Sequence, residues 1–269
     1  MKKIVLLILH PFLGKKAFQS FFQKLQLIGL YGQNYGRSGE YEESGEKVAI
    51  DYILRKLEKE NKSVIFDVGA NIGKYSRYIL ERCQPDCSVY CFEPSPTTFL
   101  QLKANLGSFE NAHCVNIGLG KSNEETTLFN NEVNTAHASL FPRDMSHWGP
   151  KYVLDKVESV VITTLDQFCQ NNKIERIDFL KIDVEGFEYN LLQGAEKMLM
   201  NRRIAHLQFE MGVCAVDAKY FFKDIYLLLA KNYDIYRILK NGLYPIENYN
   251  EQLEVFLTTN YLAVLKNTY

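Results

Sequence analysis

The segment from Val64 to Ser76 constrains the fold of this chain more than any other. Together with Ser63, its first residues predict a short buried strand from Ser63 to Asp67. Gly69 and Gly73 then predict a tight turn, and the residues after them predict the start of a helix. Because open α/β sheets bind ligands beyond the carboxyl ends of their strands, we expect Asp67 and the turn at a ligand site. A glycine has no Cβ, so we expect a ligand to lie directly on the backbone there.

The kind of ligand follows from the next strand along the chain. A dinucleotide fingerprint requires G-x-G-x-x-G, whereas this turn has the pattern D-x-G-x-N-x-G. The predicted strand from Ser88 to Phe92 ends in Glu93, and an acid at that place can accept both ribose hydroxyls of a nucleoside. The combination predicts a cofactor that contains a nucleoside. The competing interpretation is an ordinary strand–helix turn followed by a solvated acid.

Composition excludes several classes of protein. A chain of 269 residues, 46% of them hydrophobic, can form one large domain with a small appendage. The net charge of −1 gives no reason to expect a nucleic-acid partner.

Cys83, Cys87 and Cys91 have a spacing that suggests an iron–sulfur site, but Cys91 falls inside a predicted strand, so the three should not converge. Reduced cysteines instead favour a cytoplasmic protein.

We predict that the chain has two parts: a helical extension or cap at 1–45 and a ligand-binding domain at 46–269. The apolar run from Ile4 to Leu9 is too short to span a bilayer. Apolar residues between Ala17 and Gly29 recur at helical spacing with lysines between them, which predicts an amphipathic helix. Such a helix can cap the core, which we favour, or bring residues 1–30 to the inner membrane surface.

Strands and helices alternate over the remainder, which predicts a doubly wound, mostly parallel sheet with an antiparallel pair at one edge. A central strand from Ile177 to Ile182 ends in Asp183, and another from Ile204 to Phe209 ends in Glu210. Residues 242–245 are expected to form a loop, and the chain from Glu254 to Leu265 a final strand or hairpin. The long connection at 131–158 is expected to be a lid or substrate loop. Its side chains that can stack on a ligand or form hydrogen bonds with it are His137, Arg143, His147 and Trp148.

Four motifs in order resemble the FkbM family of S-adenosylmethionine-dependent methyltransferases: Phe-Asp-Val-Gly-Ala-Asn-Ile-Gly from position 66, Phe-Glu-Pro from 92, Thr-Leu-Asp from 164 and Leu-Lys-Ile-Asp-Val-Glu-Gly-Phe-Glu from 180. The resemblance implies a class I methyltransferase fold: a Rossmann-like sheet of seven strands, the last inserted antiparallel. It implies S-adenosylmethionine as cofactor and O-methylation of a sugar, glycan or lipid-linked glycan. The cofactor residues that it implies are Asp67, Gly69, Ala70, Asn71, Gly73, Glu93, Pro94, Asp183 and Glu185.

Methyl transfer to a hydroxyl needs a base within hydrogen-bond reach, and the candidates are Asp183, Glu210 and His137. We assign no metal, although Asp183, Glu185 and Glu210 also suit an oxygen-ligand site. Two other functions remain open. A nicotinamide-dependent oxidoreductase acting on a sugar or alcohol lacks support, because neither Tyr75 nor Tyr189 has a lysine at the required spacing. A non-catalytic cofactor-binding scaffold would not be expected to keep the acids at these strand ends.

Overall fold

The fold is built on an eight-stranded sheet. The computed structural model describes residues 9–36, 44–58, 62–131 and 135–267, so most of the apolar run that starts at Ile4 lies outside the described residues, as do positions 37–43 of the predicted extension. In spatial order the strands are β10 (Gly242–Ile246), β9 (Tyr233–Leu239), β11 (Thr259–Leu265), β8 (Ile204–Met211), β7 (Ile177–Ile182), β1 (Val64–Val68), β2 (Ser88–Phe92) and β3 (Ala112–Val115).

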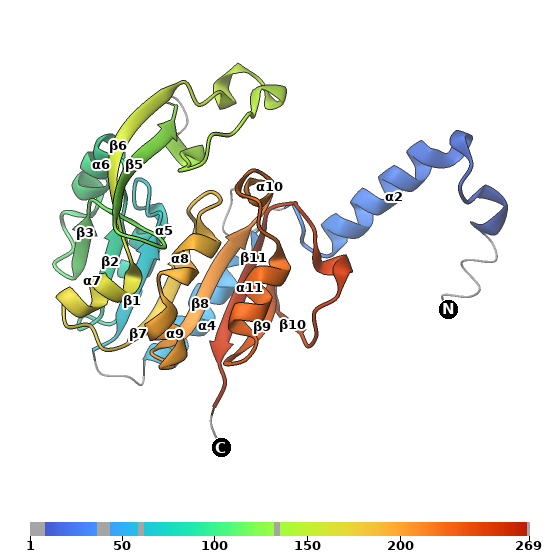
Figure 1. Cartoon of the computed structure of the whole chain (residues 1–269). Helices are drawn as coiled ribbons and strands as arrows, with labels where there is room; N and C mark the ends of the chain where they lie inside the picture. Colours follow the sequence, from blue (N-terminus) through green and yellow to red (C-terminus); the bar gives the residue numbers. More distant parts are fainter. Residues whose placement is uncertain (1–8, 37–43, 59–61, 132–134, 268–269) are drawn as a thin grey trace.

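This strand order confirms the predicted class I fold. β3, β2, β1, β7 and β8 are parallel, and the last strand of the chain, β11, is inserted antiparallel between β8 and β9. All six residues of β7 are buried, as expected for an apolar strand in the middle of a sheet with both faces covered. The carboxyl ends of β1, β2, β7 and β8 therefore meet along one edge of the sheet (Figure 1). The acids Glu93 and Asp183 follow directly after β2 and β7 at this edge.

Helices cover both faces of the sheet and form two separate cores. One face packs against α4 (Glu46–Leu57), α5 (Lys74–Leu80) and α6 (Pro96–Leu106). The other packs against α7 (Leu165–Asn171), α8 (Glu188–Gln193), α9 (Glu196–Met200) and α11 (Phe222–Leu229), with the short α10 (Cys214–Ala218) before α11. Thr164 caps α7, because its side chain accepts a hydrogen bond from the Gln167 amide.

Three further strands form a second, smaller sheet beside the carboxyl edge of the first. β4 (Gly118–Leu119) pairs with β6 (Lys156–Thr163), and β6 pairs antiparallel with β5 (Glu124–Asn130). The segment between β5 and β6 is the predicted substrate loop, and β5 and β6 carry it as an arm that projects from the domain (Figure 1). This second sheet is an addition to the single doubly wound sheet that the sequence predicts.

Two predictions near the C-terminus are wrong. Residues 242–246 are not a loop but the edge strand β10, which tolerates Pro245 because an edge strand need not donate at every residue. This strand makes the sheet eight-stranded rather than seven-stranded. Residues 254–258 are not a strand, because the Glu254 carboxylate instead accepts hydrogen bonds from the amides of Phe222 and Lys223 at the start of α11.

The N-terminal extension is helical, as predicted, but its helix does not lie over the core. α2 (Gln19–Gly32) has no buried residue and projects away from the domain (Figure 1). The chain after it is held firmly: Asn34 donates to the carbonyls of Ser44 and Ile238, and the Gly36 amide donates to Thr258. The division into an extension and a domain therefore stays a prediction, and packing of the described residues gives no support for a cap.

Candidate active site

A pocket of about 150 Å³ opens at the carboxyl edge of the sheet, between β1, β2, β7 and the second sheet. Six of the predicted cofactor residues line it: Gly69, Asn71, Glu93, Pro94, Asp183 and Glu185. The other three, Asp67, Ala70 and Gly73, are buried and do not line it. Ala138 and Leu140 of the predicted substrate loop form part of its wall. Residues from five distant parts of the sequence thus enclose one cavity.

The glycine turn is shaped by packing between protein segments. Gly69 has a φ of +80°, and a Cβ there would lie 1.8 Å from the carbonyl oxygen of Asp183. A Cβ on Gly73 would meet the side chains of Leu102 and Leu106. At both glycines the chain itself fills the space that a Cβ would take. Gly69 still lines the pocket, so contact between a ligand and its backbone stays a prediction. The close approach at Gly69 is what brings the β1 turn against the end of β7.

Glu93 closes one side of the pocket. Its carboxylate accepts one hydrogen bond from the amide of Asn71 at 3.0 Å and another from the amide of Ser95 at 3.0 Å. Burial of the side chain, which is 7% exposed, raises the pKa of Glu93 to about 7 despite these two bonds. A carboxylate oxygen has a second lone pair, so Glu93 can hold the turn and still accept a hydroxyl from the pocket.

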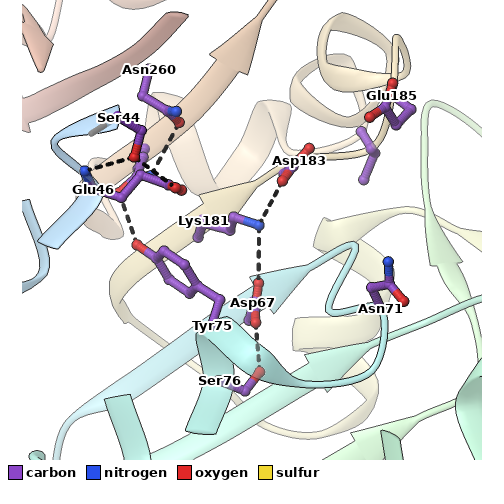
Figure 2. Close-up of polar contacts among 12 residues, drawn as sticks. Ser44, Glu46, Asp67, Asn71, Tyr75, Ser76, Lys181, Asp183, Glu185 and Asn260 are labelled. Atoms are coloured by element: carbon purple, nitrogen blue, oxygen red, sulfur yellow. Dashed lines mark hydrogen bonds and ion pairs between the residues drawn. The ribbon is translucent and has the colours of Figure 1, made fainter. Parts of the chain in front are cut away.

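A buried lysine links the strand ends of β1 and β7 (Figure 2). Lys181 Nζ lies 3.0 Å from Asp183 Oδ2 and 3.6 Å from Asp67 Oδ1, while Ser76 donates to Asp67 Oδ2 at 2.5 Å. Burial lowers the pKa of Lys181, but the carboxylates of Asp183, Asp67 and Glu46 raise it more, so it stays charged. Asp67 is fully buried and serves this network, whereas Asp183 keeps 33% of its side chain exposed.

Two further carboxylates lie beside Asp183. Oxygen atoms of Asp183, Glu185 and Glu210 all lie within 4.8 Å of one another. Burial raises the pKa of Glu210 well above its ordinary value, and the negative charges of Asp183 and Glu185 raise it further. Glu210 lies inside β8 rather than after it, opposite Asn260 of β11. A group of acids this close attracts a cationic ligand and favours sharing of protons.

The predicted substrate loop reaches the same carboxylates. Arg143 donates from Nη1 to Glu185 at 2.7 Å and from Nε to Asp217 at 3.3 Å. His137 Nδ1 lies 3.6 Å from the other oxygen of Glu185. The His137 ring contacts those of Trp148 and Tyr152, with centroids 6.3 Å and 5.5 Å away. These contacts join the loop to Glu185, which lines the pocket, whereas His137, Arg143 and Trp148 are not among the lining residues.

Two residues with structural roles at the site were given none from the sequence. Lys181 interrupts an apolar strand, and a charge inside a buried strand is a usable signal. Glu188 is 1% exposed and accepts bonds from the amides of Val184 and Gly186 and from the Tyr220 hydroxyl. Burial raises the pKa of Glu188 to about 7. It fixes the turn that carries Glu185, whose φ is +51°.

Comparison with known proteins places the chain in a family. The family model described as "Methyltransferase FkbM domain" matches residues 67–236. The 2-O-methyltransferase NoeI of Sinorhizobium fredii is 25% identical over 58% of this chain and 67% of its own length. The hexuronic acid methyltransferase AglP of Haloferax volcanii is 26% identical over 64% of this chain and 66% of its own length. The chain thus spans about two thirds of these curated relatives.

Among solved structures, fibrillarin of Aeropyrum pernix with natively bound S-adenosyl-L-methionine aligns over 81% of this chain and 74% of its own, with a TM-score of 0.42 and 12% identity. A likeness of that size adds nothing to the assignment. The assignment comes from the sequence match, which covers more than half of the chain, begins at Asp67 near the end of β1 and includes β2 and β7 with the acids that follow them. The chain belongs to the FkbM family of S-adenosylmethionine-dependent methyltransferases.

Proposed function

We propose that the protein methylates a hydroxyl group of a sugar, in a glycan or glycan precursor. The observation that carries the proposal is that Asp183, beside two further carboxylates, lines the same pocket as Glu93 and the substrate loop. Two relatives bear names that specify a 2-O-methyltransferase and a hexuronic acid methyltransferase, which agrees with a sugar acceptor. This function is favoured over a nicotinamide-dependent oxidoreductase and over a non-catalytic scaffold.

The pocket fits the cofactor of this family. Glu93 would accept the ribose hydroxyls, since each of its oxygens already takes one backbone amide and can take a second donor. The side chains of Asp183 and Glu185 provide negative charge where the sulfonium of S-adenosylmethionine would be stabilised. When bound, this cofactor supplies an activated methyl group. The protein then has to position the acceptor and remove its proton.

Asp183 is the base in this proposal. Lys181 holds its carboxylate from one side at 3.0 Å, and a third of the side chain faces the pocket or solvent. It would accept the proton that the acceptor hydroxyl loses as its oxygen attacks. Glu210 is less suited, because its raised pKa favours the protonated form. His137 would orient the acceptor from the loop, where its Nδ1 lies 3.6 Å from Glu185.

Substitution of Asp183 by Asn tests this role. Asp183→Asn keeps the size of the side chain and removes the base, so turnover with labelled cofactor and a glycan acceptor should fall about a hundredfold or more. Calorimetric affinity for S-adenosylhomocysteine should stay within a few fold of wild type. The matched control is Asp217→Asn, which changes another acid near the site, one that accepts a hydrogen bond from Arg143. Near-normal turnover in Asp183→Asn would move the base to His137 or Glu210.

We further propose that the N-terminal extension contacts an anionic membrane surface and so brings the site to a lipid-linked acceptor. No helix in the described ranges is long and apolar enough to cross a bilayer. α2 instead leaves Phe21, Leu25 and Ile28 exposed. The sequence of residues 1–39 has no Asp or Glu, although 1–8 and 37–39 lie outside the described residues. It has six cationic side chains: Lys2, Lys3, Lys15, Lys16, Lys24 and Arg37. Near an anionic bilayer each such charge contributes about 1 kcal/mol of attraction.

Vesicle co-sedimentation of the full chain tests the membrane contact. We expect binding to vesicles of phosphatidylcholine with phosphatidylglycerol, and little binding to phosphatidylcholine alone. The double variant Phe21→Ser with Ile28→Ser should lose most of this binding, whereas Gln23→Ser on the same helix should keep it. Equal binding by the double variant and wild type would refute a role for α2.

A further inference from the structure

A second hollow, of about 770 Å³, lies away from the pocket that holds Asp183. It is formed where the chain leaving α2 crosses the β9–β10 hairpin and the segment after it. Much of its lining can bond sugar hydroxyls or stack on a sugar ring: Gln33, Tyr35, Tyr244, Asn248, Asn250 and Gln252. The rest of the lining includes the apolar Leu239, Pro245, Ile246 and Leu253 and the exposed acid Glu247. This mixture of amides, tyrosines and apolar side chains is suited to a sugar, which has hydroxyls and apolar ring faces.

The lining also contains a buried cation, Arg237. It is 6% exposed, and its guanidinium lies 4.5 Å from the centre of the Tyr35 ring and 5.2 Å from that of Tyr244. Nη1 donates to the Tyr35 hydroxyl at 2.7 Å, whereas Nε is buried without a hydrogen-bond partner in the part of the chain that the structure describes. Within the described residues Arg237 makes no ion pair. A buried guanidinium without a counter-ion is costly, and its fork of donors matches an oxyanion.

We propose that this hollow is an acceptor subsite in which Arg237 binds an oxyanion, a phosphate or a carboxylate, carried by the glycan. The proposal rests on the proposed function, because it assigns an anionic group to the sugar acceptor methylated beside Asp183. Tyr244, which is 54% exposed, would stack on the sugar unit next to that group.

The position of the hollow fits an extended acceptor. β9 runs in the same direction as β7, since β11 is antiparallel to both β8 and β9 and β8 is parallel to β7. Arg237, near the carboxyl end of β9, and Asp183, after β7, therefore lie at the same edge of the sheet. Three strand spacings separate the two strands, which is roughly 14 Å at about 4.8 Å each. The anionic group would thus lie more than one sugar unit from the methylated hydroxyl.

Two sources of the oxyanion are distinguished by the probe. The hollow begins at Gly32, the last residue of α2, so a phosphate next to a lipid would reach it from the proposed membrane side. An acidic sugar would present a carboxylate instead. Inorganic pyrophosphate represents the first source and glucuronate the second, and each is titrated separately into the intact chain by calorimetry and thermal unfolding.

The variants are Arg237→Gln, Arg237→Lys and Tyr244→Ala, with Lys240→Gln as matched control because it removes a cation from the same hairpin. We expect at least one probe to bind wild type and Lys240→Gln with similar affinity, Arg237→Gln to bind at least tenfold more weakly, and Arg237→Lys to recover part of the loss. In methylation assays Arg237→Gln should raise the acceptor KM about tenfold with kcat within twofold.

Binding of neither probe to wild type, or equal binding by Arg237→Gln, would overturn the proposal. If Arg237→Gln does not fold, Tyr244→Ala tests the subsite instead, because an exposed ring can be removed without opening the core. Unchanged affinity of Tyr244→Ala for glucuronate and pyrophosphate, together with an unchanged acceptor KM, would then overturn the proposal. Affinity for S-adenosylhomocysteine should be unaffected in every variant. If wild type does not bind S-adenosylhomocysteine, that result would instead count against the proposed function.

Discussion

Glu93 is expected to make folding stability and cofactor binding respond to pH in opposite directions. The folded protein holds the Glu93 proton more tightly than the unfolded chain does, because burial raises its pKa from 4.5 to about 7. Stability contributed by this group is therefore highest at low pH and falls as the pH rises from 4.5 to 7. At about 1.4 kcal/mol per pH unit the whole effect is about 3 kcal/mol, of which about 2 kcal/mol falls between about pH 5.5 and 7.5.

Cofactor binding should change the other way. An ionised Glu93 accepts hydrogen bonds from ribose hydroxyls more strongly than a protonated one. Affinity for S-adenosylhomocysteine should therefore fall about tenfold from pH 8 to pH 6, as the fraction of ionised Glu93 falls. Glu93→Gln should bind more weakly at pH 8, by roughly one to three kcal/mol, and should lose this pH dependence.

Urea unfolding and calorimetry between about pH 5.5 and 8 measure both trends on the same samples. Glu188→Gln is the matched control, because Glu188 is also buried with a pKa of about 7 but does not line the pocket. Glu188→Gln should flatten the stability curve and leave the pH dependence of binding as in wild type. Equal pH dependence of binding in wild type and Glu93→Gln would refute the contact between Glu93 and the ribose.

Two further predictions concern the frame of the site. Gly69→Ala should destabilise the fold by about 3 kcal/mol or more in urea unfolding, since its Cβ would collide with the Asp183 carbonyl, whereas Gly14→Ala, also at positive φ but in open space, should cost about 1 kcal/mol. Equal losses would contradict the packing role of Gly69. Lys181→Met should cost about 3–5 kcal/mol, because it leaves the buried Asp67 carboxylate without its cation; unchanged stability would show that Ser76 alone satisfies Asp67.

The sequence determined the parts of this protein whose cause is local. The strands β1, β2 and β7 were predicted nearly to the residue, because a strand buried on both faces is a short apolar run bounded by a turn or a polar residue. Asp67, Glu93 and Asp183 stand at the ends of the same strands, so parallel pairing alone indicated which acids gather at one edge. The edge strand β10 was missed because Pro245 indicates a turn unless its neighbours are known.

Only the tertiary structure decided which of these groups touch. Lys181 neutralises Asp67 across 114 residues of sequence, and His137 meets Glu185 because β5 and β6 carry the loop to the end of β7. Arg237 lies against the rings of Tyr35 and Tyr244. The chain after α2 carries Tyr35 to this place, and the neighbouring strand β10 carries Tyr244. Local periodicity specifies where a strand begins and which face is buried. Contacts between distant charges depend on strand order and direction, which the whole sheet sets when its two cores pack.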